Sequence, residues 1–136
     1  MSETTMSATV IERFLDRMAA QDLAGVAALY ADDAVWEAHV PGWDGVVSSA
    51  ADRRELHESF FGRDHFAIER SQIVREGPQI ALLWDLSWRD RQDAARCTSF
   101  QSHFFEIRHG RIQRHRMHCA GVRVAGDDEG GDAPRS

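Results

Sequence analysis

The sequence contains no lysine and no asparagine, and all sixteen of its basic side chains are arginine. Without lysine the chain cannot form a Schiff base, anchor a cofactor through an amine or build a phosphate-binding loop of the Walker type. Cysteine is also scarce, because Cys97 and Cys119 are the only two and lie too far apart for a CxxC pair or a zinc finger. We interpret both as reduced thiols and expect a cytoplasmic protein.

Long apolar runs and an excess of positive charge are missing as well. No apolar run approaches the ~20 residues that a transmembrane helix needs, and the N-terminal residues lack the pattern of a signal peptide. The formal net charge is -6, whereas binding to a nucleic-acid backbone requires a positive surface. We therefore expect neither a membrane nor a nucleic acid as a partner.

The length of 136 residues suits one domain with a sizeable core. Both ends of the chain are poor in apolar side chains, and the C-terminal end is rich in acidic ones. Such segments have little surface to bury and remain mobile. We predict a flexible N-terminus at 1–7, a single domain at 8–124 and a disordered acidic tail at 125–136.

Residues 10–42 carry the clearest structural pattern, which predicts two short amphipathic helices that turn abruptly into a strand. Apolar side chains recur at helical spacing from Val10 to Met18, and Asp22 is placed to cap a second helix that ends near Tyr30. The rest of the chain predicts a third helix at 51–61 and strands at 65–75, 79–88, 96–108 and 111–124.

The ALYADDAVWE junction and the HFFEIRHGRI hairpin resemble those of the nuclear transport factor two-like superfamily, which includes ketosteroid isomerases, SnoaL-like polyketide cyclases and scytalone-type dehydratases. The resemblance covers roughly residues 8–124. It implies an α+β fold, a cystatin-like barrel in which three N-terminal helices wrap a cone-shaped, curved antiparallel sheet around a pocket. It does not name the reaction, because the architecture supports several.

Alternation along the predicted strands selects the side chains that face the interior, since successive residues point to opposite faces. On 79–88 the interior set is wholly apolar and includes Trp84 and Trp88. On 96–108 and 111–124 it includes two histidines, His103 and His115. The remaining interior positions of these strands are Ile80, Leu82, Leu86, Cys97, Ser99, Gln101, Phe105, Ile107, Met117 and Cys119.

The resemblance can be tested at the positions that carry the chemistry of the relatives. A ketosteroid isomerase needs a tyrosine on the first helix and two aspartates around the pocket, but the matching positions hold Phe14, Ala38 and His103. This chain therefore lacks that mechanism.

Two further relatives also lack a match. Limonene-type epoxide hydrolases hold a water between two aspartates and an arginine, where this chain has Trp84, Leu86 and Met117. SnoaL-like cyclases use a carboxylate in the pocket, and no predicted inward strand position carries one.

The polar groups that remain inside point to acid–base chemistry by histidine, whose pKa near neutrality suits it to accept and donate protons. We predict His103 as the acid/base and His115 as its partner, similar in residue type to the pocket histidines of scytalone-type dehydratases. We expect no cofactor and no metal, because His115 and His118 point to opposite faces of one strand. The predicted substrate-binding residues are Phe14, Met18, Tyr30, Trp36, His39, Trp84, Trp88, Gln101, Phe105 and Met117.

Three hypotheses about function remain open. The first is a cofactor-free lyase, isomerase or cyclase that acts on a small hydrophobic ring compound against a wall of tryptophans. The second is a non-catalytic protein that binds a small apolar ligand, and the third is a dimerisation module with a filled cone. Phe100 and Phe104 would lie on the outer face of the sheet, so we also predict a homodimer through that face.

Overall fold

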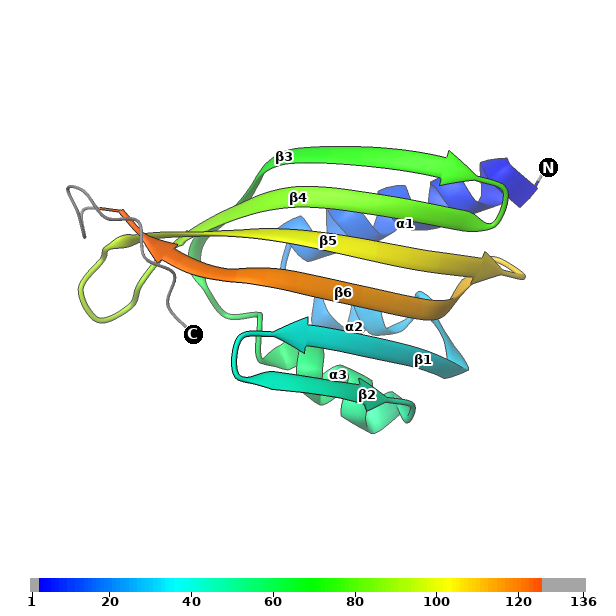
Figure 1. Ribbon diagram of the computed structural model, residues 1–136, viewed down its shortest axis with the longest axis horizontal. Coiled ribbons are helices and arrows are strands. Elements are labelled where there is room, and N and C mark those ends of the chain that lie inside the picture. Colours follow the sequence, from blue (N-terminus) through cyan, green and yellow to red (C-terminus); the bar gives the residue numbers. More distant parts are fainter. Residues whose placement is uncertain (1–2, 126–136) are drawn as a thin grey trace.

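The computed structural model describes residues 3–125, which form one six-stranded sheet and three helices (Figure 1). The strand order is β2-β1-β6-β5-β4-β3, and all three helices lie on one face of the sheet. The fold is the α+β curved sheet with three helices that the sequence predicts. The elements are α1 (Glu3–Ala19), α2 (Leu23–Ala27), β1 (Tyr30–Val40), β2 (Trp43–Val47), α3 (Ala50–Glu58), β3 (Asp64–Glu76), β4 (Gln79–Arg89), β5 (Arg96–Arg108) and β6 (Arg111–Val124).

The structure differs from the sequence prediction at the edges of the domain. Helix α1 begins at Glu3, within the segment 1–7 that the sequence predicts to be flexible. Strand β2 is not predicted, because five residues that include an exposed tryptophan and a glycine carry no strand alternation. The pairing of β1 with β6 is parallel, whereas the sequence predicts an antiparallel sheet. The predicted acidic tail lies outside the described residues, except for Ala125.

The inward faces of β4, β5 and β6 are those predicted from alternation. Every interior position predicted on β4 and β5 is buried, and on β6 His115 and Met117 are buried while Cys119 is partly buried. Two register shifts interrupt the pairing of β5 with β6, one between Ser99 and Gln101 and one between Glu106 and Ile107. The first leaves an extra residue on β6 beside Gly121, whose φ of 104° suits glycine. Each shift also changes the alternation along β6, because Ile112 and Val124 are buried at even positions, whereas His115 and Met117, between the shifts, are buried at odd ones.

The helices close the concave side of this sheet. Helix α1 buries Val10, Ile11, Phe14 and Met18 in the core, and the carboxylate of Asp22 accepts a hydrogen bond from the Gly25 amide at the start of α2, as predicted. A second, smaller apolar cluster of Trp36, Ala38 and Met117 lies under α3. Within residues 3–125, no helix is both long and apolar enough to cross a membrane.

Candidate functional site

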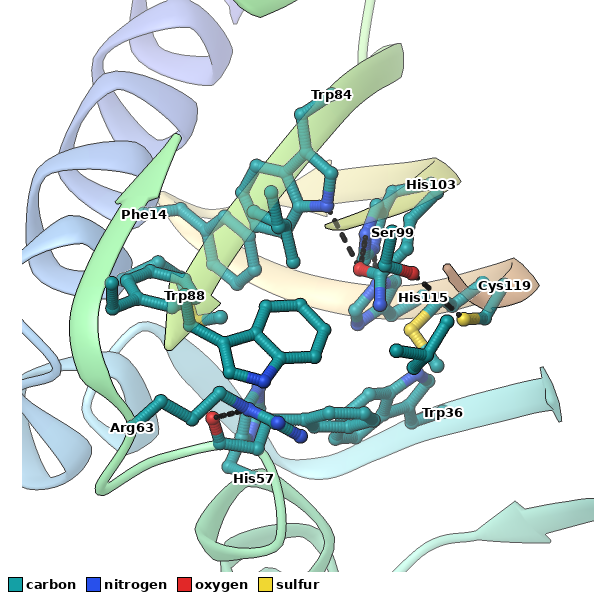
Figure 2. A pocket seen from close by; sticks show the side chains of 17 residues that line it. Phe14, Trp36, His57, Arg63, Trp84, Trp88, Ser99, His103, His115 and Cys119 are labelled. Carbon is teal, nitrogen blue, oxygen red and sulfur yellow. Dashed lines mark hydrogen bonds between the residues drawn. The ribbon is translucent and has the colours of Figure 1, made fainter. Parts of the chain in front are cut away.

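A cavity lies between the helices and the concave face of the sheet (Figure 2). Its volume is about 60 Å³, on a measure by which one water molecule needs about 10–15 Å³. The lining is mostly aromatic and apolar, with a few polar groups that come from β5, from β6, from α3 and from the loop before β3. The lining residues are Phe14, Met18, Trp36, His57, Phe60, Arg63, Phe66, Trp84, Leu86, Trp88, Ser99, Gln101, His103, His115, Met117, Cys119 and Val122.

A buried chain of hydrogen bonds runs along one side of this cavity. Its first member is His57, whose Nε2 lies 3.5 Å from the hydroxyl of Tyr30. That hydroxyl lies 2.7 Å from Nδ1 of His115, and Nε2 of His115 lies 2.8 Å from Nδ1 of His103. Nε2 of His103 ends the chain 3.0 Å from the side-chain oxygen of Gln101. Four titratable side chains from α3, β1, β5 and β6 are therefore connected without an intervening water.

The direction of the protons in this chain follows from its last acceptor. The indole Nε1–H of Trp84, which can only donate, lies 2.8 Å from the oxygen of Gln101 and fixes which way that amide points. The same oxygen must accept from His103, so His103 carries its proton on Nε2 and accepts on Nδ1. By the same logic His115 donates from Nε2 and accepts on Nδ1 from the hydroxyl of Tyr30.

His57 is left with a free lone pair at the start of the chain. Its ring donates a hydrogen bond to the backbone carbonyl of Arg53, so the proton of the neutral ring sits on Nδ1 and Nε2 faces Tyr30 unprotonated. The single proton of the Tyr30 hydroxyl is already given to His115 over the shorter distance. Nε2 of His57 therefore has no proton donor among residues 3–125, and His57 lines the cavity.

Burial keeps all three imidazoles neutral at physiological pH. Desolvation lowers the pKa of His57 to about 4, partly opposed by its hydrogen bond to the Arg53 backbone. Desolvation, with a smaller effect of His57, lowers the pKa of His103 to about 3. The pKa of His115 is held well below its usual value by burial and by both other histidines, and burial raises that of Tyr30. A neutral imidazole is the form that can accept a proton.

Arg53 positions His57 one turn later on α3. Its side chain is buried and donates to the backbone carbonyls of Ala34 at 2.6 Å and Ala31 at 3.0 Å, at the start of β1. It also donates to the carbonyls of Asp32 and Ser48. These contacts tie α3 to β1, so the helix presents His57 to Tyr30 in a fixed orientation.

Trp36, which lines the same cavity, carries a donor that no described residue uses. Its ring stacks on His115 with centroids 4.8 Å apart and 7° between the planes. The indole Nε1–H is buried and has no hydrogen-bonding partner among the described residues. A buried unpaired donor costs about 1–3 kcal/mol, and a ligand oxygen that reached this nitrogen would remove that cost.

The structure brings together most of the residues predicted from the sequence. His103 and His115 are hydrogen-bonded to each other. Tyr30 contacts His115 but does not line the cavity, and Phe105 stacks on both histidines from the side away from the cavity. The predicted binding residues that do line the cavity are Phe14, Met18, Trp36, Trp84, Trp88, Gln101 and Met117.

His39 is the third predicted binding residue that does not line the cavity. It shares the outward face of β1 with Glu37, and its ring contacts the carboxylates of Glu37 and Asp44. Hydrogen bonding to Glu37 raises the pKa of His39. Alternation along β1 already places His39 opposite Trp36 and Ala38, so its prediction as a residue of the pocket mouth conflicts with the strand period.

Sequence analysis missed His57. The residue lies in the third predicted helix, where Arg53, His57 and Phe60 recur at the i, i+4, i+7 spacing of a buried helical face. Because Arg53 is charged, the sequence pattern indicates a solvent-exposed face at these positions, although Arg53 and His57 are buried. Among residues 3–125, no group of three or more histidine, cysteine, aspartate or glutamate side chains is arranged to hold a metal ion.

Comparison with known proteins agrees with this architecture. The family of SnoaL-like domains matches residues 11–115. No sequence among the curated proteins matches the chain.

Solved structures share the fold at low sequence identity. A proposed isomerase from Bacillus subtilis superposes with a TM-score of 0.74 at 16% identity, covering 88% of this chain and 89% of the other. A proposed polyketide cyclase from Xanthomonas campestris gives 0.71 at 12% identity, covering 86% and 92%. An LEH-like epoxide hydrolase from M. tuberculosis gives 0.67 at 22% identity, covering 86% and 84%. At these identities the likeness concerns the fold alone.

Proposed function

This chain belongs to the SnoaL-like domain family, and on that premise we propose that it is an enzyme that moves protons on a small hydrophobic ring compound, as an isomerase, lyase or cyclase. The observation that carries the proposal is that His57 lines the cavity while its Nε2 has no proton donor among the described residues. The chemistry needs only side chains of this protein as acid and base.

The proposed base is His57. A proton leaves a substrate C–H or O–H bond for Nε2, and the electron pair remains on the substrate as an enolate or alkoxide. The resulting imidazolium donates to the oxygen of Tyr30, which is turned towards it because its own proton points to His115. The proton then returns to a second atom of the substrate, which completes an isomerisation, or to a leaving hydroxyl, which departs as water.

His103 and His115 keep the acid–base role predicted from the sequence, as the relay behind His57. Their ring protons all point the same way, from Tyr30 towards Gln101. A proton that enters at His57 can therefore be passed along the chain, and Nε2–H of His103 is the group that would deliver it to the cavity. The unpaired indole N–H of Trp36 is a suitable donor for the oxygen of the enolate.

The aromatic lining supports a planar apolar substrate. Phe14 and Trp84 are stacked with centroids 5.8 Å apart, and Trp36 and Trp88 form further walls of the cavity. Such walls bind rings through area burial and stacking.

A second candidate function is binding without conversion. It is favoured by the fact that both ring nitrogens of His103 and of His115 are occupied by protein groups. In this case the chain of hydrogen bonds only holds the side chains of the pocket wall in place, and His57 serves as a hydrogen-bond acceptor for a ligand hydroxyl.

Deuterium exchange tests the proposal without knowledge of the natural substrate. Cyclohexenone and tetralone are incubated with the protein in heavy water, and the loss of their acidic C–H signals is followed by proton NMR. We expect the wild type to accelerate exchange of at least one compound, and His57→Gln to reduce the acceleration by about a hundredfold. The matched control is His118→Gln. His118 is an exposed histidine on β6, next to Met117 of the cavity lining, so this variant should catalyse exchange as the wild type does.

Two results would contradict the enzyme proposal. One is no exchange above the protein-free rate for any compound, and the other is equal exchange by wild type and His57→Gln. If ligands raise the melting temperature of both proteins and none exchanges, binding without conversion is the function that remains.

We also propose a homodimer formed through the outer face of the sheet. The pairings align Val74 with Ala81 and Ala81 with Phe104, so these side chains form a row across three strands. Phe104 is 51% exposed and Phe100 46% exposed on this face. A second copy would cover these apolar side chains. Cys97 and Cys119 form no disulfide with each other, which supports the proposal of a reducing, cytoplasmic location.

A further inference from the structure

The cavity contains a charged group that the proton chain does not use, the guanidinium of Arg63. Arg63 follows α3 and lies immediately before β3, and its side chain reaches beneath Trp88 at the edge of the pocket (Figure 2). The guanidinium carbon lies 4.3 Å from the centroid of the Trp88 ring, a cation–π contact. Because the three pocket histidines are neutral, Arg63 is the one ionised side chain among the described residues of the lining.

Several contacts hold Arg63 in place. The side-chain amide of Gln21 bonds its backbone on both sides, accepting from the Arg63 N–H at 2.9 Å and donating to its carbonyl at 3.0 Å. The Nε–H of Arg63 donates to the carbonyl of Phe60 at 2.8 Å. Together with the stack on Trp88, these bonds fix both the position of the residue and the plane of its guanidinium.

The two terminal nitrogens of this fixed guanidinium have no partner within residues 3–125. The Nε bond to Phe60 is the one side-chain hydrogen bond of Arg63, and no carboxylate lies within ion-pair distance of it. The adjacent acid, Asp64, faces Arg91 instead, at 3.6 Å. Burial lowers the pKa of Arg63 without making it neutral, because a guanidinium stays protonated in proteins. The residue is a half-buried cation without an anion.

We propose that Arg63 is the anion-binding group of the pocket and that the ligand is a small carboxylate with a single ring. A planar guanidinium with two free terminal nitrogens matches a carboxylate through two parallel hydrogen bonds. The ring would lie among Phe14, Trp84 and Trp88, on the side of the cavity where His57 opens. This inference deepens the proposed function, and rests on it only in taking the same cavity as the ligand site.

The size of the cavity limits the ligand to about one ring. Its 60 Å³ is room for roughly four water molecules, which occupy about 120 Å³ as liquid. A cavity of about 150 Å³ holds benzene, so a benzoate-sized molecule requires the lining side chains to move apart, and a steroid exceeds the space altogether. The sequence alone left polycyclic ligands open, because four tryptophans are compatible with either.

Matched pairs of acids and amides test the inference. The probes are benzoate against benzamide and cyclohexanecarboxylate against its amide, measured by titration calorimetry at pH 7.5. Each pair has nearly the same shape and differs in charge. We expect the wild type to bind the acid at least about tenfold more tightly than the amide. Arg63→Gln should remove this preference and leave the affinity for the amide unchanged.

Two variants keep the result interpretable. Arg91→Gln removes a cation at the same end of the molecule that does not line the cavity, so it should retain the tenfold preference. Arg63→Lys keeps the charge but loses the planar fork, so its preference should fall between those of wild type and Arg63→Gln. If Arg63→Gln does not fold, the lysine variant and the wild-type pairs still decide the question.

Several outcomes would overturn the inference. They are equal binding of acid and amide by the wild type, an unchanged preference in Arg63→Gln, an equal loss in Arg91→Gln, and the absence of any acid that binds with a Kd below about 1 mM. None of them depends on turnover. A failed exchange experiment and a failed anion site therefore give different results.

Discussion

The hydroxyl of Tyr30 lies 2.7 Å from Nδ1 of His115, although the two residues are separated by 85 positions in the chain. The contact forms because β6, the last strand in the sequence, pairs with β1, the first. All the other strands lie between these two in the sequence. It decides where the single phenolic proton points. A distant pairing in the chain therefore sets the protonation of a neighbouring ring, that of His57.

The order of protons along the chain can be observed directly. Long-range proton–nitrogen NMR of the protein labelled with nitrogen-15 distinguishes the two neutral tautomers of each histidine. At pH 7.5 we expect His57 to carry its proton on Nδ1, and His103 and His115 to carry theirs on Nε2, because the oxygen of Gln101 fixes the direction. A proton on Nδ1 of His103 or on Nε2 of His57 would contradict the proposed order.

Stability should fall as the solution becomes mildly acidic. In the unfolded chain the three buried histidines take up protons as pH falls through about 6.5, whereas in the folded chain the pKa of His57 is about 4 and that of His103 about 3. The unfolded state then binds more protons, so unfolding becomes easier from about pH 6.5 down to about pH 4, by roughly 1.4 kcal/mol per pH unit for each ring. Above this window the contribution of these rings to stability is complete.

Urea unfolding at pH 7.5 and pH 5.0 measures this dependence. His57→Gln cannot take up the corresponding proton, so its pH slope should be smaller by about a third. His118→Gln, which changes an exposed histidine, should keep the wild-type slope. An equal free energy of unfolding at the two pH values would show that the pocket histidines are not held neutral.

Two buried tryptophans should respond differently to the same substitution. Trp36 and Trp84 are each 1% exposed, but the indole N–H of Trp84 is bonded to Gln101 and that of Trp36 has no partner among the described residues. Both changes to phenylalanine lose ring volume, while Trp84→Phe also loses a hydrogen bond and Trp36→Phe removes an unpaired donor. We expect Trp84→Phe to be less stable than Trp36→Phe by at least about 1 kcal/mol in urea unfolding. The opposite order would mean that the indole of Trp36 is satisfied.

The outer face of the sheet predicts the state of assembly. Light scattering after gel filtration should give a mass about twice the 15.4 kDa of one chain. Phe104→Glu places a charge in the row of exposed apolar side chains and should give the mass of one chain. Ala51→Glu, on the exposed side of α3, adds the same charge on the helical face and should remain dimeric. A wild-type monomer at all concentrations would exclude the homodimer.

The sequence by itself determined most of the secondary structure, without β2, and the inward faces of β4, β5 and the middle of β6. The bounds of β5 and β6 are those predicted, and alternation placed His103 and His115 inside the cone because both lie between the two register shifts, where the strand period of two is kept. Helix spacing and the cap at Asp22 defined α1 and α2 for the same reason, since both are local properties of the chain.

Only the tertiary structure decided which of these side chains meet. His57 enters the site because Arg53 ties α3 to the start of β1 through backbone carbonyls, a set of contacts that has no pattern in sequence. Tyr30 reaches His115 through the parallel pairing of β1 with β6, and Arg63 reaches Trp88 from a loop. Periodicity reports which face a residue occupies, but the partner across the cavity depends on how distant elements pack. For this reason the sequence predicted His103 and His115 as a pair, whereas the proposed base, His57, could be identified only from the fold.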